Sequence, residues 1–185
     1  RKLAELLGRL HAISGLRWIR ALYFYPSDVD DALIDAMVSL DKVVKYADIP
    51  IQHVDDKVLQ GQNRRNTYDN TCRLYDKLRK TSSDFVLRTT LITGLPGEDD
   101  AAFKRLYGFI QSHPFDHLGV FPYSPEEGTP AFHLQRPSSQ TALRRADKLM
   151  SLQRSISKER LDGCVGKVYD VLVERVDWQN GCAVG

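Results

Sequence analysis

The chain has 185 residues, and its 26 Lys and Arg against 24 Asp and Glu give a formal charge of +2 at neutral pH. With 42% hydrophobic residues, 12 Gly and 8 Pro, its composition excludes collagen-like, mucin-like and disordered chains. No run of about eighteen apolar residues and no cleavable leader occurs, so we expect no membrane partner. The cysteines match no disulfide framework, so we expect a reduced, cytoplasmic location. The first residue is Arg1 rather than Met, which indicates a piece of a longer protein.

Helical and strand-like patterns alternate through the first two thirds of the chain. The predicted helices cover residues 2–11, 28–40 (capped by Ser27), 56–59, 66–80 and 99–112. The predicted strands cover residues 16–24, 43–51, 85–93 and 117–123. Strands separated by helices pair in parallel through right-handed crossovers. We therefore predict an α/β fold of four βα units, which cannot close an eight-stranded barrel and resemble the later part of an incomplete one.

The last third has a different pattern. A long helix is predicted from Ser138 or Ser139 to Leu161, and seven Lys and Arg against two Asp and Glu give residues 135–161 a charge of +5. Such a charge is typical of a solvated face but also suits nucleic acid. A strand at 167–176 and the hairpin signal Asn180-Gly181 follow. The predicted domains are a barrel at 1–135, a basic connecting helix at 136–163 and the start of an all-β domain at 164–185.

The loops that follow the strands are the candidate working loops, because the carboxyl ends of parallel strands lie on one rim. They cover residues 25–26, 50–53, 93–98 and 123–124. In the third loop, glycine and proline shape a turn before three carboxylates at a helix start, residues 98–100. Carboxylates there compete with phosphate, so the loop favours a flat neutral ligand or one with a positive centre. Neither nucleotide-binding motif, G-x-G-x-x-G or G-K-[ST], is present.

Other chemistry-bearing residues give weaker signals. Gln52 and His53 follow an apolar strand and proline, so they project into the same rim, although a single His is more often structural. The Arg64-Arg65 pair is interpreted as a surface or a carboxylate-pairing site. Three cysteines match neither a metal-ligand run nor a disulfide framework, namely Cys72, Cys164 and Cys182. No catalytic acid or base can be assigned.

Taken together, the rim segments resemble the radical S-adenosylmethionine methylthiotransferases. The matching segments are 23–26, 48–53, 87–98, 119–131 and 149–157. The resemblance covers nearly the whole chain from about Leu16. Gln52-His53 and Arg88-Thr89-Thr90 resemble the branch that modifies a small-subunit ribosomal protein, whereas the transfer-RNA branch usually has Gln-Ser-Gly at the first place. Relatives also carry Met before Arg64, so the role of the 61–65 loop is open.

The resemblance implies a partial radical SAM barrel of six βα units between an N-terminal cluster domain and a C-terminal β-barrel of the TRAM type. This chain would hold the last four units and the first strands of TRAM. The cysteines of the barrel's cluster, in a C-x-x-x-C-x-x-C run, would lie upstream of Arg1. The full-length protein would then carry S-adenosylmethionine and two 4Fe-4S clusters, and this fragment would bind no cluster and be inactive alone.

The implied reaction is radical methylthiolation of the β-carbon of an aspartate in the ribosomal protein. Reductive cleavage of S-adenosylmethionine gives a deoxyadenosyl radical, which takes hydrogen from that carbon, while the protein supplies binding and orientation. The residues implied on the cofactor side are Gln52, His53, Arg88, Thr90, Gly94, Pro96, Gly97 and Glu98. Those implied on the substrate side are Tyr123 and Ser124.

Three alternatives stay open. The first is a transfer-RNA methylthiotransferase of the same family. The second is a module that binds the ribosome or RNA through the basic helix and the TRAM region, without catalysis; its affinity would fall steeply with salt. The third is an aldolase-like barrel, although no Schiff-base lysine stands out at a strand end.

Overall fold

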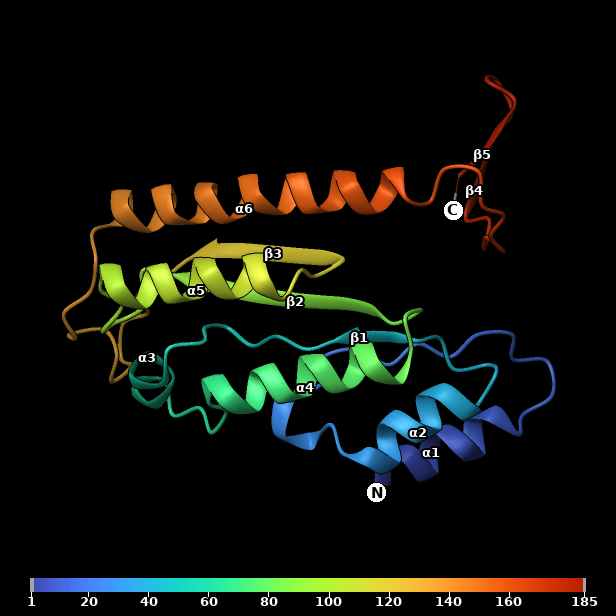
Figure 1. Ribbon diagram of the computed structural model, residues 1–185, viewed down its shortest axis with the longest axis horizontal. Helices are drawn as coiled ribbons and strands as arrows, with labels where there is room; N and C mark the ends of the chain where they lie inside the picture. The colour runs from blue at the N-terminus through green and yellow to red at the C-terminus, as the bar shows by residue number, and fades with distance from the viewer. Residues whose placement is uncertain (1, 185) are drawn as a thin grey trace.

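The computed structural model describes residues 2–184, and Figure 1 shows its arrangement. Its helices are α1 (Lys2–His11), α2 (Asp31–Ser39), α3 (Asp56–Gly61), α4 (Tyr68–Thr81), α5 (Asp100–Ser112) and α6 (Ser139–Asp162), with a 3-10 turn at Pro26–Asp28. Its strands are β1 (Tyr46–Asp48), β2 (Val86–Thr93), β3 (His117–Pro122), β4 (Arg175–Asp177) and β5 (Cys182–Val184).

The first three strands form one parallel sheet in the order β1-β2-β3. Ala47 pairs with Leu87, and Thr89 pairs with Leu118. A helix separates each strand from the next, and α4 and α5 lie together over one face of the sheet (Figure 1). The α/β class with a parallel sheet is therefore confirmed.

The two faces of β2 have different environments. Leu87 and Leu91 point into the main hydrophobic core, which α4 and α5 also line, and both are almost fully buried. Burial of apolar surface stabilises a fold by about 25 cal/mol per Å². Arg88, Thr90 and Ile92 alternate with them and are half-buried on the other face. The side chains of Arg88 and Thr90 thus lie on the face opposite α4 and α5, whereas Thr89 and Thr93 are fully buried on the core face.

The strand predicted at 16–24 is wrong in extent. One parallel bridge joins Ile19 to Val43, and the Phe24 N–H donates to the Asp48 carbonyl at 2.8 Å, but no regular strand forms. Tyr23 has a φ of +61°, a left-handed conformation that breaks extended geometry. The sheet therefore has three regular strands, with 16–24 running beside β1 as an irregular fourth segment.

The strand predicted at 43–51 is also shorter than expected, since only Tyr46–Asp48 is regular. Pro50 has no N–H to donate to a neighbouring strand. Gln52 has a φ of +67° yet still forms a parallel bridge with Leu91. The irregular segment after Asp48 thus separates β1 from one further bridge at the rim, between Gln52 and Leu91.

Side chains cap most of the helix starts. Side chains of Thr67, Asp99 and Ser138 accept N–H groups of the first turns of α4, α5 and α6. Such a cap stabilises a helix by about 1 kcal/mol. The predicted cap Ser27 is wrong, because residues 26–28 form the 3-10 turn and Asp30 caps α2 instead.

The C-terminal segment is a small antiparallel hairpin of β4 and β5 beyond the end of α6 (Figure 1). The predicted strand at 167–176 is mostly irregular, because only Arg175 and Val176 of that range belong to β4. The expected two-residue turn is a four-residue loop between Asp177 and Cys182. Within residues 2–184, no helix combines the length and apolar character that a membrane span requires.

Candidate functional site

The loops after the strands meet at one end of the sheet. The Gln52 N–H donates to the Thr90 carbonyl at 2.9 Å, and the Ile92 N–H donates to the Gln52 carbonyl at 2.8 Å. The Tyr123 N–H donates to the Thr93 carbonyl at 2.8 Å. These bonds bring the loops at 50–53, 93–98 and 123–124 together, as the topology predicts.

The first loop joins the rim through the 61–65 loop. The Arg64 guanidinium lies 5.3 Å from the centre of the Tyr25 ring and donates to the Pro50 carbonyl at 3.1 Å. Burial lowers the pKa of Arg64, which the nearby Tyr25 partly opposes. The Arg65 N–H donates to the Tyr25 hydroxyl at 3.3 Å. Within residues 2–184 Arg64 pairs with no carboxylate; it joins two rim loops through a ring and a carbonyl, and Arg65 is exposed at the surface.

The glycine-proline turn is held by its own carboxylate and by α6. The Gly94 N–H donates to Glu98 Oε2 at 2.9 Å. Gly94 has a φ of +80°, and a Cβ there would overlap the Cβ of Ala142 on α6. Gly97 also has a positive φ, +84°, but it is exposed and has open space around it. The turn thus packs against α6 at one glycine and opens to solvent at the other.

Glu98 belongs to a buried ion cluster. Arg145 of α6 donates to Glu98 Oε1 at 2.6 Å and to the Glu98 carbonyl at 3.1 Å. Its second terminal nitrogen donates to Asp100 at 2.6 Å. Side-chain exposure is 5% for Arg145 and 0% for Glu98. Glu98 and Asp100 therefore pair with Arg145, and Asp99 caps α5.

His53 lies beneath the same turn and is fully buried. Its Nδ1 accepts the Asp55 N–H at 2.9 Å, and its Nε2 lies 3.5 Å from Glu98 Oε2 without a hydrogen-bond partner. Asp55 in turn caps α3 and pairs with Arg105. This histidine links the loop after β1 to the turn after β2, a supporting position behind the rim.

Gln52 combines two unusual features. Its φ is positive although it is not glycine, and its Oε1 is buried without a hydrogen-bond partner. Each feature costs free energy, and such costs are concentrated at functional sites. Among the predicted site residues, Gln52 has the clearest unused binding group.

Arg88 and Thr90 lie on the face of β2 opposite α4 and α5, at different depths. Arg88 donates to the buried Asp48 at 3.0 Å and pairs in register with His117 at the first residue of β3. Thr90 is two residues nearer the rim, about 7 Å along the strand. The structure therefore places Thr90 beside Gln52 and sets Arg88 deeper, away from the turn.

A small apolar cluster adjoins the turn. Val58, Leu95 and Ala102 are buried in it, and Ile92 and Tyr123 are half-buried against it. Ser124 is exposed, and Pro96 is buried within the turn. The half-buried side chains offer an apolar surface beside Gly97 and Gln52.

Sequence reasoning missed Ile92 and Arg145. Ile92 continues the alternation of Arg88 and Thr90 toward the rim, so the period of β2 could have identified it. The buried positions of α6 are Ala142, Arg145, Ala146, Leu149 and Gln153. Their three-and-four spacing places an arginine on the apolar face, and that is the signal that separates it from the exposed basic residues.

No group of three or more His, Cys, Asp or Glu among residues 2–184 could hold a metal ion. Cys72 is half-buried on α4, and burial raises the pKa of its thiol. Cys164 and Cys182 are exposed in the C-terminal segment. Three cysteines placed in this way do not fit an iron-sulfur cluster.

Comparison with known families identifies the class. Residues 2–110, more than half of the chain, match the Radical SAM superfamily. The parallel α/β fold and the rim at the carboxyl ends of its strands agree with this match, and the chain belongs to that superfamily.

Similar curated proteins share one name, ribosomal protein uS12 methylthiotransferase RimO. The protein of Acetivibrio thermocellus is 46% identical over 178 residues, covering 95% of this chain and 39% of the relative. That of Caldicellulosiruptor saccharolyticus is 42% identical, covering 96% of this chain and 40% of the relative. The chain thus spans about two fifths of the length of these relatives.

Solved structures support the fold alone. Coproporphyrinogen III oxidase (HemN) from Escherichia coli, described as a radical SAM enzyme, matches with a TM-score of 0.63 at 17% identity, covering 84% of this chain and 36% of that one. Elp3 of Methanocaldococcus infernus matches with a TM-score of 0.55 at 18% identity, covering 75% and 33%.

Proposed function

We propose that this chain is the later part of a radical SAM methylthiotransferase that acts on ribosomal protein uS12. The observation that carries the proposal is the similarity to RimO proteins across 95% of the chain, at 46% identity. The rim supports it, since loops far apart in sequence converge beside an unused polar atom and an apolar surface. The target group we propose is the β-carbon of an aspartate.

The residues at the rim fit a nucleoside. The buried, unpartnered Oε1 of Gln52 can accept a hydrogen bond from an amino or hydroxyl group. Ile92 and Tyr123 offer apolar surface to a flat base, and Gly97 lets a ligand approach the backbone closely. When bound, S-adenosylmethionine would supply the radical that takes hydrogen from the substrate.

The remaining predicted residues have more indirect parts in this proposal. Gly94, Pro96, Glu98 and His53 shape and support the turn, since three of them are buried within it and His53 lies beneath it. Thr90 faces the open side of the sheet near Gln52, and Tyr123 and Ser124 border the substrate side. Arg88 would act deeper on that face.

Several finer features belong to the proposal as well. The half-buried polar face of β2 would line the interior of a partial barrel, and the exposed β4-β5 hairpin would begin a TRAM domain. The cluster ligands would come from cysteines outside this chain, so the fragment alone would be inactive. The cytoplasmic location stays a prediction.

The test uses the full-length protein, reconstituted anaerobically with iron and sulfide. We expect uptake of S-adenosylmethionine, formation of 5′-deoxyadenosine and gain of one methylthio group on an aspartate of uS12, located by peptide mass spectrometry. Transfer RNA incubated in parallel tests the sister branch. Modified transfer RNA with unmodified uS12 would contradict the proposed substrate.

The rim is tested separately by equilibrium binding of S-adenosylmethionine. Gln52→Leu removes one buried hydrogen bond, so we expect affinity to fall about tenfold, or roughly 1.4 kcal/mol. Gln153→Leu is the matched control, because its Oε1 is also buried without a partner but its amide contacts the Phe115 carbonyl at the opposite end of the sheet. Equal losses in both variants would remove Gln52 from the site.

A further inference from the structure

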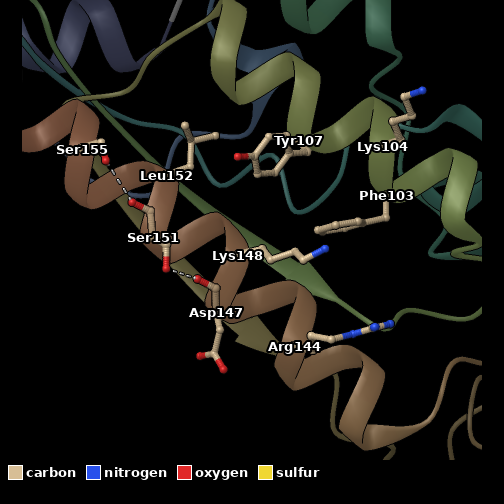
Figure 2. Close-up of a pocket in the computed structure, with 9 residues that line it drawn as sticks. All are labelled: Phe103, Lys104, Tyr107, Arg144, Asp147, Lys148, Ser151, Leu152 and Ser155. Atoms are coloured by element: carbon tan, nitrogen blue, oxygen red, sulfur yellow. Dashed lines mark hydrogen bonds between the residues drawn. The ribbon is translucent and has the colours of Figure 1, made fainter.

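A groove runs between α5 and α6 on the helical side of the molecule, with a volume of about 780 Å³ (Figure 2). Its lining residues are Phe103, Lys104 and Tyr107 from α5 and Arg144, Asp147, Lys148, Ser151, Leu152 and Ser155 from α6. None of them belongs to the rim described above. The groove therefore needs its own explanation.

The structure separates the basic residues of α6 into engaged and free ones. Arg145 pairs with Glu98, Arg160 with Asp116 and Lys158 with Asp162. Arg144 and Lys148, which line the groove, form no ion pair within residues 2–184. Two of the unpaired cations of the basic helix, Arg144 and Lys148, therefore line this groove, whereas Arg154 lies outside it.

A third lining cation comes from the other wall. Lys104 of α5 is exposed and likewise forms no ion pair within the described chain. Among the lining residues Asp147 is the one carboxylate, and Figure 2 shows its side chain directed away from α5. The local charge of the groove is +2, as high as that of the whole chain.

The α5 wall also carries aromatic surface. The rings of Phe103 and Tyr107 are half-buried, with centres 6.4 Å apart. The Arg145 guanidinium lies 5.2 Å from the centre of the Phe103 ring and so helps to fix it. Cations that follow a backbone beside rings that stack bases are the combination by which proteins hold single strands.

We propose that this groove binds a short single-stranded RNA segment, with phosphates at Lys104, Arg144 and Lys148 and a base against Tyr107 or Phe103. An acidic peptide would satisfy the cations but leave the aromatic wall without a matching partner. The proposal rests on the proposed function only for the source of the RNA, since a ribosomal substrate is presented in an RNA-rich particle.

The test measures anisotropy of a fluorescein-labelled ten-nucleotide uridine RNA with the full-length protein between 50 and 200 mM salt. The variant Lys104→Gln/Arg144→Gln/Lys148→Gln should bind at least tenfold more weakly at 50 mM. The slope of log affinity against log salt should become shallower by about 2, because each lost phosphate contact contributes about 0.7 on a single strand. All three side chains are exposed, so thermal unfolding should be unchanged.

The matched control is Lys57→Gln/Arg73→Gln/Lys80→Gln, which removes the same charge from exposed positions on α3 and α4. It should keep the wild-type slope. Tyr107→Leu should weaken binding about tenfold while keeping that slope, since stacking of one base contributes about 1–3 kcal/mol.

Equal losses of RNA affinity in the two triple variants, or no loss in either, would contradict the proposal that this groove binds RNA. The proposal would also be contradicted if an acidic ten-residue peptide bound to the wild-type protein and more weakly to the groove variant, while RNA bound to neither. The RNA assay contains no S-adenosylmethionine and no uS12. Failure of methylthiolation with intact groove-dependent RNA binding would therefore count against the proposed function and not against the groove.

Discussion

Two arginines of α6 form similar ion pairs at opposite ends of the sheet. Arg145 reaches Glu98 and Asp100 at the carboxyl ends of the strands. Arg160 reaches Asp116, just before β3, at 2.6 Å and also donates to the Pro114 carbonyl at 2.9 Å. One helix thus fastens the candidate site at one end and the framework of the sheet at the other.

The two pairs differ in burial and in redundancy. Side-chain exposure is 5% for Arg145 but 34% for Arg160. Asp116 also accepts from Arg79 at 2.8 Å and from the Leu87 N–H at 2.7 Å. Burial lowers the pKa of Arg79, but hydrogen bonds to Tyr75 and Asp116 outweigh it and the net pKa is raised. Loss of Arg160 leaves Asp116 with Arg79 and the Leu87 N–H, whereas loss of Arg145 leaves the fully buried Glu98 with the Gly94 N–H as its remaining hydrogen-bond donor.

The largest expected effect is that of Arg145→Met. Removing one partner of a buried pair strands the other, so we expect unfolding free energy in urea to fall by about 3–5 kcal/mol. The turn at 94–98 should also lose its shape, so S-adenosylmethionine binding by the full-length protein should weaken in conditions where the variant is folded.

A double-mutant cycle sharpens this prediction. Glu98→Gln keeps an oxygen for the Gly94 N–H but removes the charge that Arg145 balances. The double variant should therefore lose less unfolding free energy than the sum of the losses in the two single variants. Simple additivity would show that Arg145 and Glu98 do not stabilise the turn as a pair.

A smaller effect is expected for Gly94→Ala at the same end of α6. Its φ of +80° disfavours a side chain, and the new Cβ would overlap Ala142. We expect a loss of about 1–3 kcal/mol in unfolding free energy, from strain and overpacking together.

Adding Ala142→Gly separates the two causes of that loss. It removes the overlapping methyl group, so the steric part of the cost should disappear while the backbone part remains. Gly97→Ala is the comparison for φ alone, because open space surrounds that residue. If Ala142→Gly restored none of the lost unfolding free energy, overlap with α6 would not contribute to the cost of Gly94→Ala.

Much of the fold could be predicted from the sequence because its signals are local. Periodic apolar positions and capping side chains located α1 and α4 to α6 within two residues at each end. The strand extents were wrong where the backbone leaves extended geometry at Tyr23 and Gln52. Neither residue type demands a positive φ, so tertiary pairing sets these conformations and local sequence does not reveal them.

The candidate site also has one feature that could be predicted from the sequence and one that could not. The shared rim follows from parallel topology, so Gln52 and the turn at 94–98 could be placed together before any coordinates. The pairing of Glu98 could not, because its partner lies 47 residues away on a helix with several other basic residues. For that reason the sequence pattern alone does not show that Arg145 neutralises part of the negative charge at the turn.

The smallest expected effect is that of Arg160→Met, at the other end of the helix. Asp116 keeps Arg79 and the Leu87 N–H, and water can reach both side chains, so we expect a loss of about 0.5–1.5 kcal/mol in urea unfolding. Binding of S-adenosylmethionine should not change, because Arg160 contacts residues before β3 and none at the rim. If Arg160→Met cost as much as Arg145→Met, burial would not be what distinguishes the two ends. If it weakened cofactor binding equally, α6 would act on the site as one rigid body rather than through Arg145.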